Sequence, residues 1–544
     1  MVSNAVFKIE KPKNEPALSY APGTKEREEL KARLVELRTQ EIEIPLIIGG
    51  KEVRTGKLGK CIIPHNKEVV IGRYHMAGEK EVNDAIEAAL AARHDWESMP
   101  WEHRASIFLK AAEMIAGPCR STINAATMLC QSKTAYQAEI DSACELIDML
   151  KFNAYFLNEI YKEQPESTKD SWNRMEYRAL EGFVFAVTPF NFTSIAGNLP
   201  TSAAMAGNVV LWKPASSAVY SAYHVMTILR KAGLPDGVIN FIPGPGNVLG
   251  SIALLNPWLA GVHFTGSTAT FQSMSQTVGQ NLPNYRTYPR LVGETGGKDF
   301  VFVHPSADLE PLVTALVRGA FEFQGQKCSA ASRAYVPESM WPALKKRLVE
   351  EISTIKMGDI EDFTNFMGAV IDAQAFQSIK GYIDYAKESP EAEIICGGNA
   401  DDSVGFFIDP TVIVTTNPRF KTMEEEIFGP VLTIYVYKDE EIEEALDLCD
   451  STSIYGLTGA VFAQDREAIV KIEKRLTHAA GNFYINDKPT GAVIAQQPFG
   501  GARASGTNDK AGSKINMMRW VSPRAIKEHL NPPVGYRYPF MDEK

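Results

Sequence analysis

The centre of the chain alternates short, mainly apolar runs with longer stretches of helical pattern. The runs span residues 183–187, 209–212, 238–242 and 262–265. Strands that read as continuous apolar runs, joined by helices, are typical of a parallel sheet covered on both faces. We therefore expect an α/β fold in this region. Ligands of such sheets bind outside the carboxyl ends of the strands, which predicts where a site should lie.

The segments that follow these runs are short, polar and rich in Gly or Pro. They comprise residues 188–192, 213–216, 244–246 and 265–267. The alternation resumes later, with candidate strands at residues 334–336, 393–395, 411–414, 432–436 and 459–462. A chain of 544 residues exceeds what one hydrophobic core normally supports, so the later strands predict a second α/β domain.

The regions outside the predicted sheets have other patterns. Residues 1–40 are polar and contain proline, with a helical pattern at residues 24–39, which predicts an arm packed on a domain. Residues 80–163 have the spacing of long helices. Residues 167–177 are polar and are expected to form an exposed hairpin. With the segment from Arg519 onward they could form an oligomer contact, although a plain surface loop fits the pattern equally well.

The composition is that of a globular enzyme and argues against several kinds of partner. Apolar residues make up 45% and charged residues 22% of the chain. The net charge of -10 comes without a dense basic block, which argues against nucleic acid. The 7 cysteines and 9 histidines show no metal-ligand spacing, and the odd cysteine count favours a reducing compartment. The sequence shows no membrane-spanning run, signal peptide or Arg-rich presequence.

Cys328 stands out among the cysteines because its surroundings can present a thiol to a ligand. Residues 321–330 are polar and contain glycine, whereas the other cysteines lie in mostly apolar or helical contexts. A free cysteine in an apolar context usually behaves as a small buried hydrophobe. Upstream, Glu294 lies in residues 293–298, whose glycines leave its carboxylate open to close approach by a ligand. Together the two residues predict a reactive pair.

A dinucleotide site has weak local support and stronger collective support. Gly244, Gly246 and Gly250 approximate the G-x-G-x-x-G fingerprint with the third glycine one residue late, a spacing that fits an ordinary turn as well. The collective support comes from three further features. Lys213 follows a predicted strand, Gly266 and Ser267 precede a predicted helix, and Glu426 supplies a carboxylate later in the chain. A lysine and a helix N-terminus suit phosphate groups, and a carboxylate accepts ribose hydroxyls.

Seven ordered motifs carry a family resemblance. They are TPFNF at 188–192, KPA at 213–215, FTGS at 264–267, ETGGK at 294–298, GQKC at 325–328, EEIFGP at 425–430 and PFGG at 498–501. In this order they resemble the aldehyde dehydrogenase superfamily. Further signatures at residues 181–183, 207–214, 480–488 and 496–509 are similar to its branch that oxidises glutamate semialdehyde, Δ1-pyrroline-5-carboxylate dehydrogenase. The similarity runs from about residue 14 to the C-terminal region.

The resemblance implies catalytic and cofactor-binding roles. Cys328 would be the nucleophile, and Asn191 would donate its side-chain amide to the oxyanion together with the Cys328 backbone N–H. Glu294 would activate water for deacylation, and NAD would accept the hydride. The residues that would position NAD are Lys213, Ser216, Gly266, Ser267, Thr268, Ala269, Thr270, Glu426 and Phe428. Ser216 stands where many NAD-preferring relatives place a glutamate, which leaves NADP open as a secondary cofactor.

Substrate recognition is implied at a second group of residues. The backbone N–H groups of Gly491 and Ala492 and the hydroxyl of Ser329 would hold the substrate carboxylate. Phe192 and Phe499 would line its aliphatic chain. Ala492 stands where some members of the branch carry serine, so we expect weaker discrimination at most, because the backbone donors remain.

The resemblance also implies a domain plan. A Rossmann-like, parallel-sheet NAD-binding domain would comprise residues 41–165 and 184–293, and a second α/β domain, the catalytic one, residues 294–502. Residues 1–40 would form the arm, and residues 166–183 and 503–544 a small β oligomerisation element. Members of the family are dimers or higher oligomers, so a homodimer or higher homo-oligomer is expected. A bacterial cytoplasm is the first choice of compartment, and the mitochondrial matrix if the chain is eukaryotic.

The favoured function is NAD-dependent oxidation of L-glutamate 5-semialdehyde, which is in equilibrium with Δ1-pyrroline-5-carboxylate, to L-glutamate in proline breakdown. Another short carboxylated aldehyde stays open as the substrate. A CoA-acylating enzyme is disfavoured by the presence of Glu294. A non-catalytic protein that keeps the fold is disfavoured because Cys328, Glu294 and Asn191 occur together.

Overall fold

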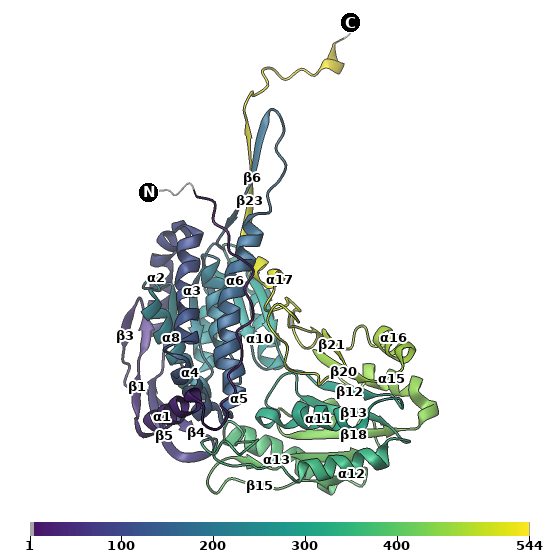
Figure 1. Ribbon diagram of the computed structural model, residues 1–544. Helices are drawn as coiled ribbons and strands as arrows, with labels where there is room; N and C mark the ends of the chain where they lie inside the picture. The colour runs from purple at the N-terminus through teal and green to yellow at the C-terminus, as the bar shows by residue number, and fades with distance from the viewer. Residues whose placement is uncertain (1–4, 543–544) are drawn as a thin grey trace.

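The structure is a computed structural model that describes residues 5–542 and contains two seven-stranded sheets (Figure 1). The first has the strand order β11-β10-β7-β8-β9-β2-β3. Its strands are β2 (Leu46–Ile48), β3 (Lys51–Val53), β7 (Phe183–Val187), β8 (Val209–Lys213), β9 (Ile239–Phe241), β10 (Leu259–Thr265) and β11 (Arg290–Glu294). Strands β7 to β11 are parallel, whereas β2 runs antiparallel to β9. The four strands predicted from the apolar runs are therefore confirmed.

Strands β7, β8 and β10 are buried almost from end to end. A strand covered on both faces has no solvent side, so apolar residues follow one another without alternation. Helices α2 and α7 pack against β8. The helices of this half are α1 (Lys25–Thr39), α2 (Glu79–Ser98), α3 (Trp101–Ala116), α4 (Arg120–Gln131), α5 (Ala135–Ala138), α6 (Leu146–Tyr161), α7 (Thr193–Met205), α8 (Val219–Ala232), α9 (Gly246–Ala253) and α10 (Thr268–Gln280).

The second sheet has the order β14-β17-β18-β13-β12-β20-β21 and is parallel except for the edge strand β14. Its strands are β12 (Asp299–Val303), β13 (Ala331–Pro337), β14 (Ala392–Cys396), β17 (Thr411–Thr415), β18 (Val431–Tyr437), β20 (Thr458–Phe462) and β21 (Asn482–Ile485). Its helices are α11 (Leu309–Phe321), α12 (Trp341–Ile352), α13 (Ala373–Glu388), α14 (Lys421–Glu424), α15 (Ile442–Ser451) and α16 (Arg466–Arg475). This sheet confirms the second α/β region.

Two apolar clusters cover the two faces of the second sheet. Phe300 and Phe302 of β12 belong to one cluster, whereas Val301 and Val303 belong to the other. Successive side chains of a strand point to opposite faces, so the clusters lie on opposite sides. Both faces are thus buried, as the uninterrupted apolar pattern predicts.

The long helical region contains a break that its sequence pattern does not predict. Residues Glu139–Glu145 form a π-helix, η1, between α5 and α6. Glu139 and Asp141, on this π-helix, are buried. π-Helical turns are rare and occur frequently at functional sites, and this one lies next to the site described below.

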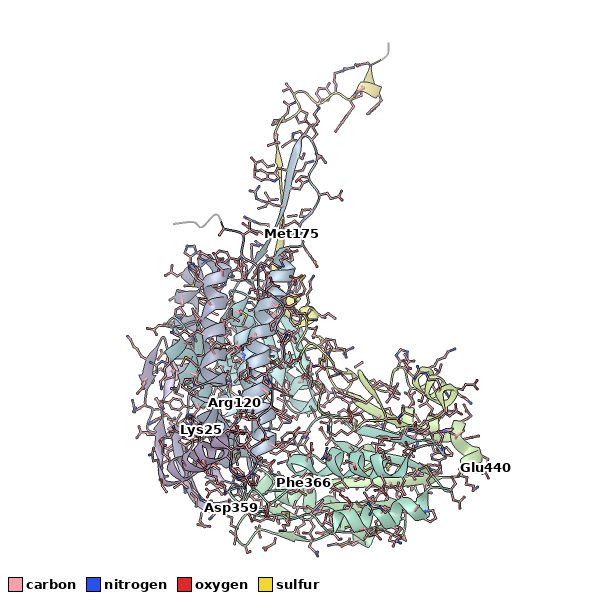
Figure 2. All side chains as sticks on the ribbon, viewed as in Figure 1. Lys25, Arg120, Met175, Asp359, Phe366 and Glu440 are labelled. Carbon is pink, nitrogen blue, oxygen red and sulfur yellow. The ribbon has the colours of Figure 1, made fainter. Side chains whose placement is uncertain are left out.

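Strands β6 (Ser171–Arg178) and β23 (Ser522–His529) form a two-stranded ribbon that projects from the body (Figure 1). Met175, opposite Ala525, lies where the ribbon leaves the body (Figure 2). The expectation of a hairpin within residues 167–177 is therefore wrong in its pairing. The partner strand comes instead from the C-terminal segment, which pairs in continuous register along the whole of β6.

The remaining elements are short. They are β1 (Ile42–Ile44), β4 (Leu58–Ile63) and β5 (Asn66–His75) in one small sheet, the pairs β15 (Ala400–Asp401) with β16 (Phe407–Ile408) and β19 (Tyr455–Gly456) with β22 (Ala502–Arg503), and α17 (Lys514–Met518). Before α1, residues 5–23 run along α6 without regular structure (Figure 1). Within the described residues 5–542, no helix is long and apolar enough to cross a membrane.

Candidate active site

Cys328, the predicted nucleophile, lies in a loop that follows α11 and is held from several sides. We call this loop, residues 322–329, the nucleophile loop. Phe323 and Gln324 have φ values of 52° and 55°, in the left-handed region that residues with side chains seldom adopt. The Gln324 amide donates to the carbonyl oxygens of Ser132 (3.1 Å) and Ala369 (2.7 Å), and its oxygen accepts a backbone N–H. Such backbone strain persists only where the surroundings over-determine it, so the loop presents Cys328 at a defined position.

Asn191 lies just before α7 and reaches the nucleophile loop. Its side-chain amide donates to the carbonyl oxygen of Gln326, at 3.1 Å, and both residues are buried. Gln326 is itself fixed because its side-chain oxygen accepts the backbone N–H of Ile371, at 2.8 Å. The structure therefore brings the Asn191 amide to within two residues of Cys328.

Glu294 is the last residue of β11, and the charge of its carboxylate acts on the Cys328 thiol. Burial, followed by the charges of Glu294, Asp299 and Glu426, raises the pKa of Cys328 well above its ordinary value. Burial also raises the pKa of Glu294 to about 8. Both groups hold their protons at neutral pH, so catalysis requires that a proton leave this cluster.

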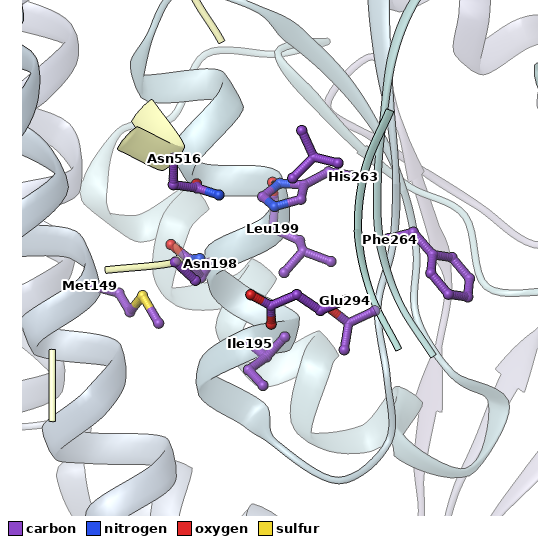
Figure 3. Close-up of a pocket in the computed structure, with 11 residues that line it drawn as sticks. Met149, Ile195, Asn198, Leu199, His263, Phe264, Glu294 and Asn516 are labelled. Carbon is purple, nitrogen blue, oxygen red and sulfur yellow. The ribbon is translucent and has the colours of Figure 1, made fainter. Parts of the chain in front are cut away.

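The Glu294 side chain faces a small cavity of about 20 Å³ (Figure 3). Polar residues that line it include Asn198, His263 and Asn516. Burial lowers the pKa of His263 to about 3, so its ring is neutral there. A cavity of this size has room for one water molecule, which is the substrate of a general base.

Ser329 meets the segment before Gly491. The Ser329 and Thr490 hydroxyl oxygens lie 2.8 Å apart, and both residues are buried. We call residues 490–497 the substrate loop. Gly491 has a φ of 93°, which favours glycine, and Ala492 follows it half-buried. The predicted carboxylate-binding groups are thus neighbours of Cys328.

The two predicted apolar residues lie at the edges of this region. The Phe192 ring packs edge-on against Phe323, with centroids 6.5 Å apart. Phe499 is half-buried and exchanges backbone hydrogen bonds with Ala511 (3.0 and 2.8 Å). Ala511 also lines the cavity beside Glu294, so the Phe499 strand borders the same region.

The residues expected to bind a dinucleotide lie at the ends of β8 and β10. Lys213, at the end of β8, is half-buried, and its ammonium group has no hydrogen-bond or ion-pair partner within residues 5–542. Gly266, Ser267, Thr268, Ala269 and Thr270 form the start of α10, where the Ser267 hydroxyl accepts the Thr270 N–H. A lysine and a helix N-terminus offer donors to phosphate groups, so this chemistry fits NAD.

Glu426 and Phe428 lie between α14 and β18 of the second half. A Glu426 carboxylate oxygen accepts the Gly297 N–H, at 2.9 Å, and burial raises the pKa of Glu426 to about 7. A Cβ on Gly296 would lie 2.2 Å from this carboxylate, so only glycine permits the approach. Phe428 has a φ of 57° and packs edge-on against Phe190. The carboxylate fits ribose hydroxyls, which need an acceptor.

Comparisons with known proteins agree with this geometry. The family described as Aldehyde dehydrogenase family matches residues 53–526. The chain belongs to the aldehyde dehydrogenase family. Relatives named mitochondrial Δ1-pyrroline-5-carboxylate dehydrogenase include those of Dictyostelium discoideum, 51% identical over 98% of this chain and 96% of the relative, and Homo sapiens, 50% identical over 97% and 94%. The predicted family and branch are confirmed.

Solved structures of aldehyde dehydrogenases confirm the fold. The Δ1-pyrroline-5-carboxylate dehydrogenase of Mycobacterium tuberculosis bound with NAD has a TM-score of 0.96 and 48% identity, covering 99% of this chain and 100% of that one. A 1-pyrroline-5-carboxylate dehydrogenase from Thermus with bound NAD has a TM-score of 0.90 and 31% identity, covering 96% and 100%.

A buried polar cluster in this aldehyde dehydrogenase was missed by the sequence analysis. The Lys133 ammonium lies 2.6 Å from Asp141 and 4.1 Å from the Phe192 ring centroid. Asp141 accepts the first backbone N–H groups of α7, and Glu145 accepts the hydroxyl of Ser194, at 2.9 Å. Burial raises the pKa of Glu145 to about 8. The sequence signal that could have revealed this cluster is the presence of charged residues in otherwise apolar helical stretches.

Two weaker predictions for the cofactor site concern Ser216 and the glycines that approximate the dinucleotide fingerprint. Ser216 is exposed at the start of a short 3-10 helix. Gly244 lies between β9 and α9, Gly246 is the first residue of α9, and a Cβ on Gly246 would lie 4.0 Å from the Lys213 side chain. The glycine-containing turn therefore adjoins the predicted phosphate lysine although its spacing departs from the fingerprint.

Proposed function

We propose that this aldehyde dehydrogenase oxidises L-glutamate 5-semialdehyde, the open form of Δ1-pyrroline-5-carboxylate, to L-glutamate in proline breakdown, with NAD as the acceptor. The contact that carries the proposal is the 2.8 Å pairing of Ser329 with Thr490. It fixes a hydroxyl and the Gly491 backbone beside Cys328, where a carboxylate and an aldehyde of one substrate can bind together. Relatives at 50% identity with that name support the same substrate.

Cys328 starts the reaction as the nucleophile. Its thiol loses its proton to solvent, and the sulfur bonds the aldehyde carbon while the carbonyl oxygen becomes an oxyanion. The Asn191 amide and the Cys328 backbone N–H donate to that oxyanion. Removing one such donor lowers the rate by about 10²- to 10³-fold in other enzymes.

The thiohemiacetal then loses hydride and becomes a thioester on Cys328. NAD, when bound, supplies the hydride acceptor for this step. Lys213, the segment from Gly266 to Thr270, Glu426 and Phe428 would hold it through phosphate and ribose contacts, and Ser216 would lie toward its adenosine ribose. Ser216 offers no anion against a 2′-phosphate, so NADP stays a secondary candidate.

Glu294 completes the cycle as a general base. It takes a proton from a water molecule, the water oxygen bonds the thioester carbon, and the carbon–sulfur bond breaks. The sulfur leaves as a thiolate and takes up the proton held by Glu294, which restores the Cys328 thiol. The new carboxyl group of glutamate releases the second water proton to solvent. The adjoining cavity supports this role because it has room for one water beside the carboxylate.

Substrate selectivity rests on the substrate loop. Backbone N–H groups of Gly491 and Ala492 and the Ser329 hydroxyl bind the α-carboxylate, while Phe192 and Phe499 pack on the aliphatic chain. The N–H groups of a turn with a positive φ form a concave donor site that suits a carboxylate.

The initial rate of NADH formation tests this function. We expect L-pyrroline-5-carboxylate to be oxidised with a much higher kcat/KM than propanal, and with a higher one than succinate semialdehyde. Comparable rates for all three would leave an aldehyde dehydrogenase with another substrate. No rate with any aldehyde would favour a non-catalytic protein that keeps the fold.

We also propose that the protein is a homodimer or higher homo-oligomer built through residues 166–183 and 503–544. The β6–β23 ribbon and the following tail expose large apolar side chains, among them Trp172, Tyr536 and Phe540. Such a surface is typical of an interaction site. Light scattering should give at least twice the chain mass of 60.0 kDa, and a deletion after residue 521 should reduce it to the monomer.

The division into an arm (1–40), an NAD-binding domain (41–165 and 184–293) and a catalytic domain (294–502) stays a prediction. It is supported by the first sheet, which supplies the expected phosphate site, and by the second half, which supplies Cys328. The compartment also stays a prediction. Curated relatives from Dictyostelium discoideum and Homo sapiens are named as mitochondrial, whereas a bacterial cytoplasm remains our first choice.

A further inference from the structure

The part of the predicted arm that precedes α1, residues 5–23, is held by side chains rather than by a sheet. We call these residues the N-terminal arm. Its backbone N–H groups at Ile9, Glu15 and Leu18 donate to Asn158 (3.1 Å), Asp148 (2.8 Å) and Glu139 (2.8 Å), respectively. An isolated buried carboxylate is unfavourable, so each of these acids in the helical layer requires such partners. The arm therefore is part of the fold of that layer.

Arg120, the first residue of α4 in the helical layer, also binds this arm; Figure 2 labels its position. Its guanidinium donates to the Glu15 carboxylate (2.7 Å) and to the Pro16 carbonyl oxygen (3.0 Å), and it pairs with Glu139. Buried, charge-assisted hydrogen bonds of this kind are stronger than neutral ones. The arm consequently has a fixed course across α6 and the π-helix.

Asn14 is the point where this arm meets the substrate loop. Its amide nitrogen donates to the Asp148 carboxylate (2.8 Å) and to the Ile494 carbonyl oxygen (2.9 Å). Its amide oxygen accepts from the Gln496 side chain, at 2.9 Å. Both amide hydrogens and the oxygen are thus used, and two of the three bonds go to the loop.

The substrate loop has few other attachments. Gly491 and Gln496 are exposed, and Ala495 adopts a φ of 64°. Its other tethers within residues 5–542 include the Ser329–Thr490 contact, the Ala495 N–H that donates to the Gly512 carbonyl oxygen, and the packing of Ile494 on α6. Asp148 neighbours Met149 in α6, so Asn14 joins the loop to the same helix that Ile494 packs on.

We propose that Asn14 is a positioning residue for the substrate loop, and that through it the N-terminal arm sets selectivity for carboxylated aldehydes. The inference rests on the proposed role of Gly491 and Ala492 in binding the α-carboxylate. Asn14 itself contacts no reacting group. It fixes the carbonyl side of Ile494, two residues beyond Ala492, and thereby the direction of the preceding N–H groups.

Steady-state kinetics of Asn14→Ala and Asn14→Asp test the proposal. The first removes both loop contacts, and the second, of the same shape, places a carboxylate against Asp148 and the Ile494 carbonyl oxygen. We expect the KM for L-pyrroline-5-carboxylate to rise about tenfold in Asn14→Ala, and further in Asn14→Asp. The kcat/KM for propanal, which has no carboxylate, should stay within about twofold.

Two further variants make the test specific. Asn158→Ala loosens the arm at Ile9, away from the loop, and should leave the ratio of the two kcat/KM values unchanged. Gln496→Leu removes a loop contact of Asn14 from the other side, and its effect should be less than additive with that of Asn14→Ala. Hydrogen exchange at residues 491–497 should quicken in Asn14→Ala and in Gln496→Leu, but not in Asn158→Ala.

The outcomes separate this inference from the substrate assignment. Suppose that the unmodified protein prefers the carboxylated substrate. The positioning role is then wrong if Asn14→Ala lowers activity equally toward both aldehydes, or if it leaves activity toward both unchanged. If the unmodified protein shows no preference, the substrate assignment fails and the inference fails with it. If the Asn14 variants do not fold, the selectivity ratio of Gln496→Leu decides in the same way.

Discussion

The nucleophile loop and the substrate loop border one site but are held in different ways. Gln324 and Gln326 in the nucleophile loop are buried, and their side chains bond the backbone of segments far away in sequence. The substrate loop is partly exposed and depends on Thr490, Ile494 and the contact with Asn14. The difference suggests that the chemistry shared by aldehydes is built rigidly, whereas the choice among them depends on a few replaceable contacts. Changes in the first loop should therefore lower all rates, and changes in the second should alter ratios.

The largest expected effect is at Cys328. Cys328→Ala removes the thiol that forms the thiohemiacetal in the proposed mechanism, so oxidation of every aldehyde should fall by at least about 10³-fold. Binding of NAD, followed by fluorescence quenching, should persist because the thiol is not among the phosphate or ribose contacts. Normal turnover in this variant would contradict a covalent mechanism.

Glu294→Gln should lower steady-state turnover by about 10²- to 10⁴-fold while the first hydride transfer continues. The amide cannot take a proton from water, so acyl-enzyme accumulates. Rapid mixing should show a burst of NADH equal to the active sites, followed by slow release. A slow reaction without a burst would place Glu294 before hydride transfer.

Gln324→Leu tests the rigidity of the nucleophile loop. The substitution leaves the Ser132 and Ala369 carbonyl oxygens without this donor and releases two residues from left-handed backbone. Misplacement of Cys328 should lower kcat by up to about 10²-fold, with the same factor for L-pyrroline-5-carboxylate and propanal. A change confined to the carboxylated substrate would erase the distinction between the two loops.

The pH dependence gives a smaller effect at the same site. Glu294, with a pKa raised to about 8 by burial, acts as a base only after it loses its proton. Activity limited by deacylation should therefore rise with pH, about tenfold from about pH 7 to about pH 9. The rise should be absent from the deacylation rate of Glu294→Gln. A flat profile in the unmodified protein would mean that bound ligands return this pKa to its usual range.

The sequence predicted the rigid parts of the molecule better than the adjustable ones. Buried parallel strands such as β7 read directly as apolar runs, and the order of motifs located Cys328, Asn191 and Glu294. The contact of Asn14 with Ile494 joins residues 480 positions apart, and Glu139 of the π-helix accepts the backbone N–H of Leu18, 121 positions away. Local periodicity carries no information on such tertiary partners, and the β6–β23 pairing was misjudged for the same reason.

The smallest expected effect, and the sharpest for the substrate loop, is at Ala492. Ala492→Ser adds one hydroxyl next to the proposed backbone donors, and one additional hydrogen bond to a carboxylate should lower the KM for L-pyrroline-5-carboxylate by about three- to tenfold. The kcat should change little, since Cys328, Asn191 and the cavity beside Glu294 are untouched. Propanal, measured in parallel, should react as before. In combination with Asn14→Ala the gain should shrink, because a hydroxyl on a loosened loop is no longer held toward the carboxylate. An equal gain in both backgrounds would show that the loop keeps its shape without the arm, and that the two regions differ less than their contacts indicate.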